Sequence, residues 1–198
     1  MGQGALRAAR ALAVGRDPRA AAEAIEATFE GSNDRGSLWL PFFGSLVEVT
    51  YPDLDVRADP ELPPHIKALL MHHIARSDGT RPTGRWVAFS ELPDGSFYSA
   101  AFRGYAPDAI VRRLAARPEA LSEAVARLGG EPLAGIADRA WTVLALPRVP
   151  LALLWWDADE EFGARCDILF DSTAANHLPT DGCAVLGSWL VARLLARA

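Results

Sequence analysis

The pattern of apolar and polar positions predicts a helical beginning to the chain. Residues 5–14 are rich in alanine, which favours a helix. Asp17 and Pro18 supply an N-cap and a first-turn proline for a second helix, which we expect to end near Glu30. Residues 31–37, GSNDRGS, have the composition of a loop. We therefore predict an N-terminal helical segment over residues 1–30.

Three pairs of short apolar runs predict β-hairpins, in residues 38–52, 86–105 and 141–156. Pro41 belongs at the edge of the first pair, because proline has no amide hydrogen to donate. Pro93, Asp94 and Gly95 divide the second pair, and this order suits a tight turn with glycine in the left-handed position. Pro147 and Pro150 prevent full pairing in the third.

Four further helices are expected, and prolines open three of them. They span about residues 64–77, 107–116, 118–128 and 181–197, with Gly129 and Gly130 closing the third and Thr180 capping the last. His73 falls on the apolar face of the first, as a hydrogen-bonded core histidine would. About six hairpin-linked strands with five or six helices predict an α+β fold, with a mixed or mainly antiparallel sheet. We expect residues 1–198 to form a single domain.

Composition indicates an ordinary cytoplasmic protein. The 198 residues are 50% hydrophobic and carry a net charge of −5, which argues against a nucleic-acid partner that needs a basic surface. No apolar run approaches the ~20 residues of a membrane-spanning helix, and no secretory leader is recognisable. Cys166 and Cys183, the only cysteines, are expected to be free thiols in a reducing compartment.

An acidic segment follows the last predicted strand. Seven carboxylates and one arginine, Arg165, lie between residues 157 and 181. Asp157, Asp159 and Glu161 have a spacing that suits a hard divalent cation, and Asp171 could join them. The glycine and bidentate glutamate of a calcium loop are missing. The alternative is a solvated turn that Phe162 anchors against the core.

His177 and Asp171 are candidates for catalysis. They are six residues apart in a segment that must turn before Pro179, so the carboxylate could orient the imidazole as a general base. The alternative role for His177 is to cap a helix or to bond to a loop.

The second predicted hairpin carries aromatic residues around one arginine. Trp86 and Tyr98 could stack on a ligand, while Arg103, together with Arg148 from the third hairpin, could bind its negative charge. The alternative is a sheet face covered by helices, with Arg103 paired to a surface carboxylate.

Five segments together resemble a family of prokaryotic proteins that share a domain of unknown function. They are TGRWVAFSELPDGSFYSAAFRGY (83–105), LGGEPL (128–133), LPRVPLALLWWDADEEF (146–162), ILFD (168–171) and LPTDGCAVLG (178–187). The resemblance spans residues 38–195 and implies a single domain of this size. Some members carry an N-terminal iron–sulfur module, which implies a redox setting for those. This chain has no cysteine before Cys166.

Three hypotheses follow, and whether the protein is an enzyme stays open. The first is a binding or accessory domain for a small anionic ligand or cofactor, which uses Trp86, Tyr98, Arg103 and Arg148. The second is a divalent-metal-dependent enzyme that uses the carboxylates of residues 157–171, with His177 as general base. The third is a protein-interaction module, such as a homodimer or the partner of a redox protein.

Overall fold

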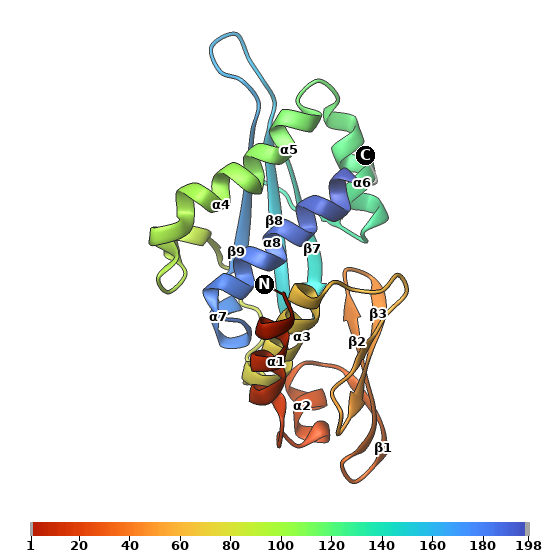
Figure 1. The fold of residues 1–198 in the computed structure, drawn as a ribbon. Coiled ribbons are helices and arrows are strands. Elements are labelled where there is room, and N and C mark those ends of the chain that lie inside the picture. Colours follow the sequence, from red (N-terminus) through yellow and green to blue (C-terminus); the bar gives the residue numbers. More distant parts are fainter. Residues whose placement is uncertain (1, 197–198) are drawn as a thin grey trace.

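The computed structural model describes residues 2–196 and has an α+β fold, as the sequence predicted (Figure 1). Its helices are α1 (Gly2–Ala13), α2 (Pro18–Ala24), α3 (Pro64–Arg76), α4 (Ser99–Tyr105), α5 (Pro107–Leu114), α6 (Pro118–Arg127), α7 (Ala174–His177) and α8 (Thr180–Leu195), with 3-10 helices η1 (Phe89–Glu91) and η2 (Gly95–Tyr98). Its strands are β1 (Thr28–Ser32), β2 (Arg35–Phe42), β3 (Ser45–Tyr51), β4 (Val56–Arg57), β5 (Trp86–Ala88), β6 (Glu131–Pro132), β7 (Arg139–Leu146), β8 (Val149–Trp156) and β9 (Arg165–Asp171).

The strands form two antiparallel sheets instead of the one sheet expected. The first has the order β1-β2-β3-β4 and the second β5-β9-β8-β7-β6. Helices α4, α5, α6 and α8 lie over one face of the second sheet, and α1 packs beside α3 (Figure 1). The Phe43 amide donates to the Ala145 carbonyl at 2.9 Å, which joins the β2–β3 turn to the end of β7. One hydrophobic cluster therefore includes residues from both sheets.

The first predicted hairpin is confirmed as β2 and β3, but a further strand precedes it. β1 pairs with β2 around a turn at Asn33, in residues predicted as helix and loop. Gly31 and Gly36 make this possible, because a Cβ on either would meet backbone atoms of the other strand at under 3 Å. Pro41 lies beyond the end of the β1 pairing, so no donor is missing from the sheet there.

The third predicted hairpin is confirmed as β7 and β8, with an irregularity between Leu144 and Leu146 beside Pro150. The second is wrong. Only residues 86–88 are extended, and they pair with β9; residues 89–105 form η1, η2 and α4. Tyr98, Phe102 and Tyr105 recur at intervals of four and three residues, a helical spacing that was present in the sequence.

The four later helices are confirmed, with shorter ends. Asp17 caps α2 as predicted, since its carboxylate accepts from the Ala20 amide at 2.7 Å. Gly129 has a left-handed φ of 73°, and the Gly130 amide donates to the Val125 carbonyl, which closes α6. Thr180 is not a cap: it is the first residue of α8, and its hydroxyl donates to the Pro93 carbonyl instead.

The helical layer packs on the second sheet through a close approach of α8 to Phe102. A Cβ on Gly187 would lie 2.7 Å from the Phe102 ring. That ring cannot easily move, because it stacks on Phe89 at a centroid distance of 4.4 Å and also contacts Phe170. Glycine at position 187 therefore sets the distance between α8 and α4.

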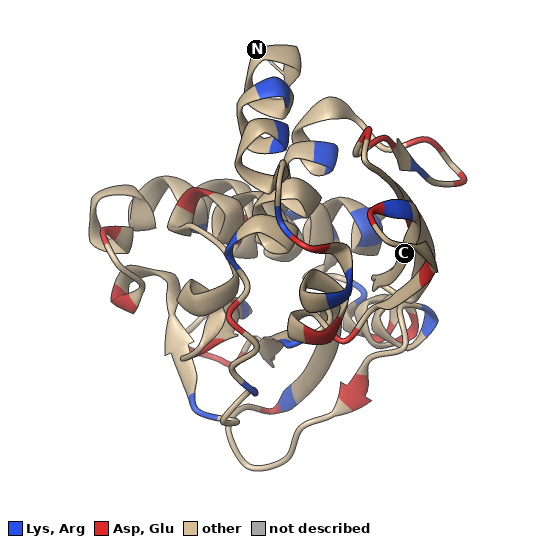
Figure 2. Ribbon diagram, turned by 90° about the horizontal axis from the view of Figure 1, so that it is seen from below, with Lys and Arg blue, Asp and Glu red and all other residues tan. Residues whose placement is uncertain are grey.

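Acidic and basic residues are interspersed along the ribbon in Figure 2. Within residues 2–196, no helix is long and apolar enough to cross a membrane.

We predict that Gly187→Ala lowers the free energy of unfolding by about 1–3 kcal/mol, because the added methyl group overpacks against Phe102. Gly104→Ala is the matched control, since nothing lies within 4 Å of its Cβ position in α4. It should raise stability by about 0.5–1 kcal/mol through helix propensity. Urea denaturation measures both, and a neutral Gly187→Ala would show that the ring can yield.

Candidate functional site

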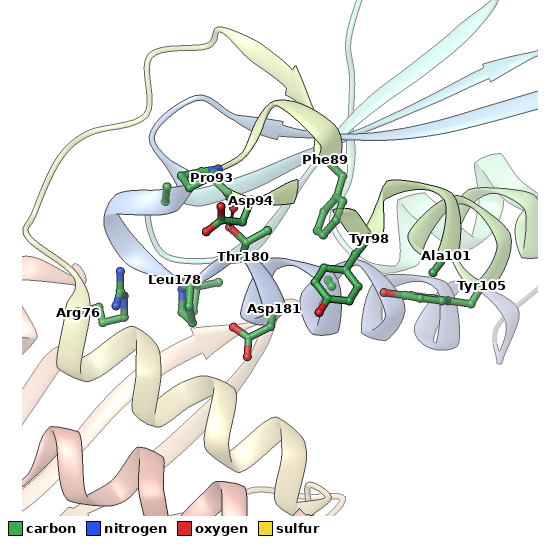
Figure 3. Close-up of a pocket in the computed structure, with 13 residues that line it drawn as sticks. Arg76, Phe89, Pro93, Asp94, Tyr98, Ala101, Tyr105, Leu178, Thr180 and Asp181 are labelled. Atoms are coloured by element: carbon green, nitrogen blue, oxygen red, sulfur yellow. Dashed lines mark hydrogen bonds between the residues drawn. The ribbon is translucent and has the colours of Figure 1, made fainter. Parts of the chain in front are cut away.

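A pocket of about 570 Å³ lies between two walls that are distant in sequence (Figure 3). One wall is formed by η1, η2 and α4, and the other by α7 and the start of α8. Its lining is mainly apolar and aromatic, with Arg76 at one end. A concave apolar site of this size with a few polar groups is typical of small-molecule binding.

Local sequence shapes the first wall. Asp94 adopts a left-handed conformation with φ 58°, and Gly95 follows it so closely packed that a Cβ would lie 1.9 Å from the Phe89 carbonyl oxygen. This turn leads through η2 into α4, and Tyr98 at the end of η2 faces the pocket together with Ala101 and Tyr105 of α4, at helical spacing.

The second wall is held against the first by one hydrogen bond. The Thr180 hydroxyl donates to the Pro93 carbonyl at 2.6 Å, and so joins the start of α8 to the turn before η2. Leu178 and Pro179 add apolar surface to the wall. Phe89, stacked on Phe102, lines the pocket on the side of the sheet.

Three charged side chains line the pocket. Among the described residues, Arg76 and Asp94 have no side-chain hydrogen bond or ion pair, and Asp181 accepts only from the Gly182 amide, at 2.9 Å. In Figure 3 the two carboxylates lie between Arg76 on one side and Tyr98 and Tyr105 on the other. Of these five, the sequence predicted only Tyr98 as a ligand contact; it placed Tyr105 in the same aromatic group and Asp181 in the acidic segment without giving either that role. Helical spacing in residues 98–105 was the signal that Tyr98 and Tyr105 share a face.

Asp171 does not face this pocket but supports its wall. Its side chain is fully buried and accepts hydrogen bonds from the amides of Gly84 (2.7 Å), Thr83 (3.0 Å) and Thr173 (3.0 Å), and from the Thr173 hydroxyl (2.8 Å). Burial raises the pKa of the carboxyl, but the hydrogen bonds from Thr173, Thr83 and Gly84 outweigh it, so the pKa lies below its ordinary value. The carboxylate thus fixes the loop before β5 to the turn before α7.

His177 is held by a different partner from the one predicted. Its Nδ1 lies 2.7 Å from the Ser77 hydroxyl oxygen, and both side chains are buried. Burial lowers the pKa of His177, although Asp78 partly opposes this. Neighbouring Asn176 donates to the Asp78 carboxylate at 2.7 Å. His177 and Asp171 make no hydrogen bond to one another, and together they anchor α7 on the end of α3 and on β9.

His73 packs against His177, with ring centroids 6.0 Å apart. It is fully buried, as its position on the apolar face predicted, but neither ring nitrogen has a hydrogen-bond partner among the described residues. Burial, with smaller contributions from His177 and Arg16, lowers its pKa to about 3 even though the His177 backbone acts in the opposite direction. The imidazole is therefore neutral in the folded protein.

The carboxylates proposed as metal ligands do not converge. Asp157 accepts from the Trp155 indole at 2.8 Å, and Asp159 accepts from the amides of Glu161 and Phe162. These residues follow β8, whereas Asp171 ends β9 at the opposite end of the same hairpin. Within residues 2–196, no group of three or more His, Cys, Asp or Glu side chains could hold a metal ion. Phe162 is 70% exposed and does not anchor the turn.

Three of the four ligand candidates lie outside the pocket. Arg103 pairs with Asp167 at 2.7 Å, beside a second cavity across α4. Arg148 donates to the Gly79 carbonyl and pairs with Glu26, so it joins the β7–β8 turn to the loop after α3. Trp86 packs against a small separate cluster formed by Ala140, Ala152 and Leu154. Only Tyr98 lines the pocket.

Comparison with known families finds one match. The family model described as "Domain of unknown function (DUF3786)" matches residues 17–193. The match begins earlier than the resemblance over residues 38–195 suggested, and it includes α2, β1 and the start of β2. No curated protein and no solved structure shows significant similarity to the chain.

We predict that Asp171→Asn lowers the free energy of unfolding by about 2–4 kcal/mol, because buried donors lose their anionic acceptor. Urea denaturation at neutral pH measures this. Glu160→Gln, on the exposed turn after β8, is the control and should stay within about 0.5 kcal/mol of the wild type. A loss under about 1 kcal/mol for Asp171→Asn would show that the carboxylate is not a structural anchor.

Stability should fall with decreasing pH because of His73. Below its ordinary pKa of 6.5 the unfolded chain takes up a proton there, whereas the folded chain does not until about pH 3. The free energy of unfolding should therefore decrease by up to about 1.4 kcal/mol per pH unit. His73→Leu should reduce this slope by that amount. Denaturation at a series of pH values measures the slope, and an equal slope in His73→Leu would contradict the assignment.

Proposed function

The chain belongs to the DUF3786 family of domains of unknown function, and we propose that it is a small-molecule-binding domain. The ligand occupies the pocket between the η1–η2–α4 wall and the α7–α8 wall. The observation that carries the proposal is the pocket itself: about 570 Å³ of space lined by aromatic and apolar side chains, with unpaired charges facing it. This volume falls within the ~300–1,000 Å³ of ordinary ligand sites.

The way the walls are held supports a preformed site. Asp171 and His177 fix α7 from behind, and the Thr180–Pro93 hydrogen bond fixes α8 to the opposite wall. A pocket held in this way loses little conformational entropy when a ligand binds. In this proposal Asp171 and His177 support a binding wall, and their contacts with Thr173 and Ser77 favour that role over the general-base role considered from the sequence.

A second candidate is protein docking, favoured by the exposed aromatic residues at this end of the molecule. Phe97 is 81% exposed, Tyr98 68% and Tyr105 46%. Exposed aromatic side chains in a group are characteristic of interaction surfaces. The concave pocket lined by Tyr98 and Tyr105 gives small-molecule binding the stronger support, because a docking face needs no such hollow.

The test is to fill the pocket from an exposed position. Ala101→Trp places an indole in the cavity. The control is Ala100→Trp, because Ala100, the preceding residue of α4, lines the second cavity across that helix. Both alanines are exposed, so both variants should fold. We expect at least one of three fragments, 2-phenylethanol, phenethylamine or 3-phenylpropanoate, to bind the pocket. The affinity of that fragment for Ala100→Trp should equal its affinity for the wild type.

Ala101→Trp should weaken that binding at least about tenfold, since the indole takes the place of the ligand. Chemical-shift titration of the labelled protein measures each dissociation constant. If no fragment distinguishes Ala101→Trp from Ala100→Trp, the pocket is not a ligand site and the proposal fails.

A further inference from the structure

We infer that the ligand of this pocket carries a positively charged amine joined to an apolar body. This inference rests on the proposed function and goes beyond it by naming the ligand class. The sequence alone favoured an anionic ligand, on the assumption that Arg103 and Arg148 would face it. Both guanidinium groups already have partners: Arg103 pairs with Asp167, and Arg148 pairs with Glu26 and donates to the Gly79 carbonyl.

The charge of the lining favours a cation. Two carboxylates, Asp94 and Asp181, line the pocket, against one guanidinium, Arg76. Neither carboxylate forms an ion pair with Arg76 or with another basic side chain of the described chain. They come from different segments, the η1–η2 turn and the first turn of α8, yet face the same cavity.

Filling the pocket places a requirement on the ligand. A body that covers Asp94 and Asp181 removes water from both carboxylates, and that loss is unfavourable unless the ligand supplies a compensating donor. A neutral apolar ligand supplies none, and an anionic one adds repulsion. An ammonium group supplies both a positive charge and hydrogen-bond donors.

The aromatic lining favours the same chemistry. In Figure 3 Tyr98 lies on the side of the carboxylates and Tyr105 beyond it, and both exposed rings have negative faces toward which a cation is attracted. Phe89 continues this aromatic surface toward the sheet. An amine near the carboxylates could therefore contact a tyrosine ring while its apolar body packs against Phe89 and Leu178.

Arg76 distinguishes this inference from its opposite. It lies at the far end of the pocket from the tyrosines (Figure 3) and has no side-chain partner among the described residues. If the ligand is an amine, the guanidinium repels it weakly. If the ligand is an anion, Arg76 is its main attraction. Removing this one charge therefore changes the two affinities in opposite directions.

The experiment compares three fragments of similar size that differ in charge: phenethylamine, 2-phenylethanol and 3-phenylpropanoate. We expect phenethylamine to bind wild type most tightly. Asp94→Asn and Asp181→Asn should each weaken it about two- to fivefold, and Tyr98→Leu should weaken it by a similar factor. Arg76→Ala should strengthen it about twofold. Asp34→Asn, an exposed carboxylate in the β1–β2 turn, is the control for the overall negative charge and should have no effect.

Each other outcome overturns a defined statement. Tighter binding of 3-phenylpropanoate or 2-phenylethanol, still blocked by Ala101→Trp, overturns the amine and leaves the proposed function standing. If Asp34→Asn weakens phenethylamine binding as much as Asp94→Asn and Asp181→Asn do, the binding depends on net charge alone. That result also overturns the amine site. Fragments that bind Ala101→Trp and Ala100→Trp alike overturn both the inference and the proposed function.

Discussion

The buried carboxylate of Asp171 is the constraint on which the pocket depends. A fully buried charge is unfavourable unless it is bonded, and Asp171 meets this condition with donors from two separate segments, residues 83–84 and Thr173. Satisfying the carboxylate therefore brings the loop before β5 to the end of β9 and starts the turn that leads into α7. The wall formed by Leu178 and Pro179 follows directly from that turn.

A second set of contacts determines how far the opposite wall stands from this one. Phe89, Phe102 and Phe170 pack together on the helical face of the second sheet, and Gly187 lets α8 approach the Phe102 ring. Because ring packing fixes α4 relative to β9, the tyrosines of α4 are presented at the edge of the aromatic cluster. The cavity lies between the η1–η2–α4 wall and the start of α8, beside the Thr180–Pro93 hydrogen bond.

The polar groups of the molecule fall into two kinds, and the difference bears on function. Asp171, His177, Arg148 and Arg103 each have a hydrogen-bond or ion-pair partner and connect elements of the fold. Within residues 2–196, Arg76 and Asp94 have no such side-chain partner and Asp181 has only the adjacent amide, although all three face a cavity. Residue type alone does not separate these kinds, since aspartate and arginine occur in both. The unpaired charges indicate where a ligand would supply what the protein does not.

The sequence predicted those parts of the structure that depend on contacts between residues close together along the chain. Local periodicity, capping residues and turns determined α3, α5, α6, α8 and the β2–β3 and β7–β8 hairpins, because their pairings join residues close in sequence, at most 16 positions apart in β7–β8. The sequence also identified Tyr98 as a ligand candidate. It failed over residues 89–105, where a turn signal compatible with a hairpin was satisfied by two 3-10 helices.

The site itself was decided by tertiary structure. Asp171 accepts hydrogen bonds from Gly84 and Thr83, which are 87 and 88 positions away in the sequence. His177 bonds to Ser77, which is 100 positions away. A sequence shows that a buried carboxylate needs donors, but not which distant backbone amides will reach it. The sequence by itself thus determined the charged and aromatic side chains and most of the helices and strands that carry them. Only long-range packing decided that these side chains line one cavity.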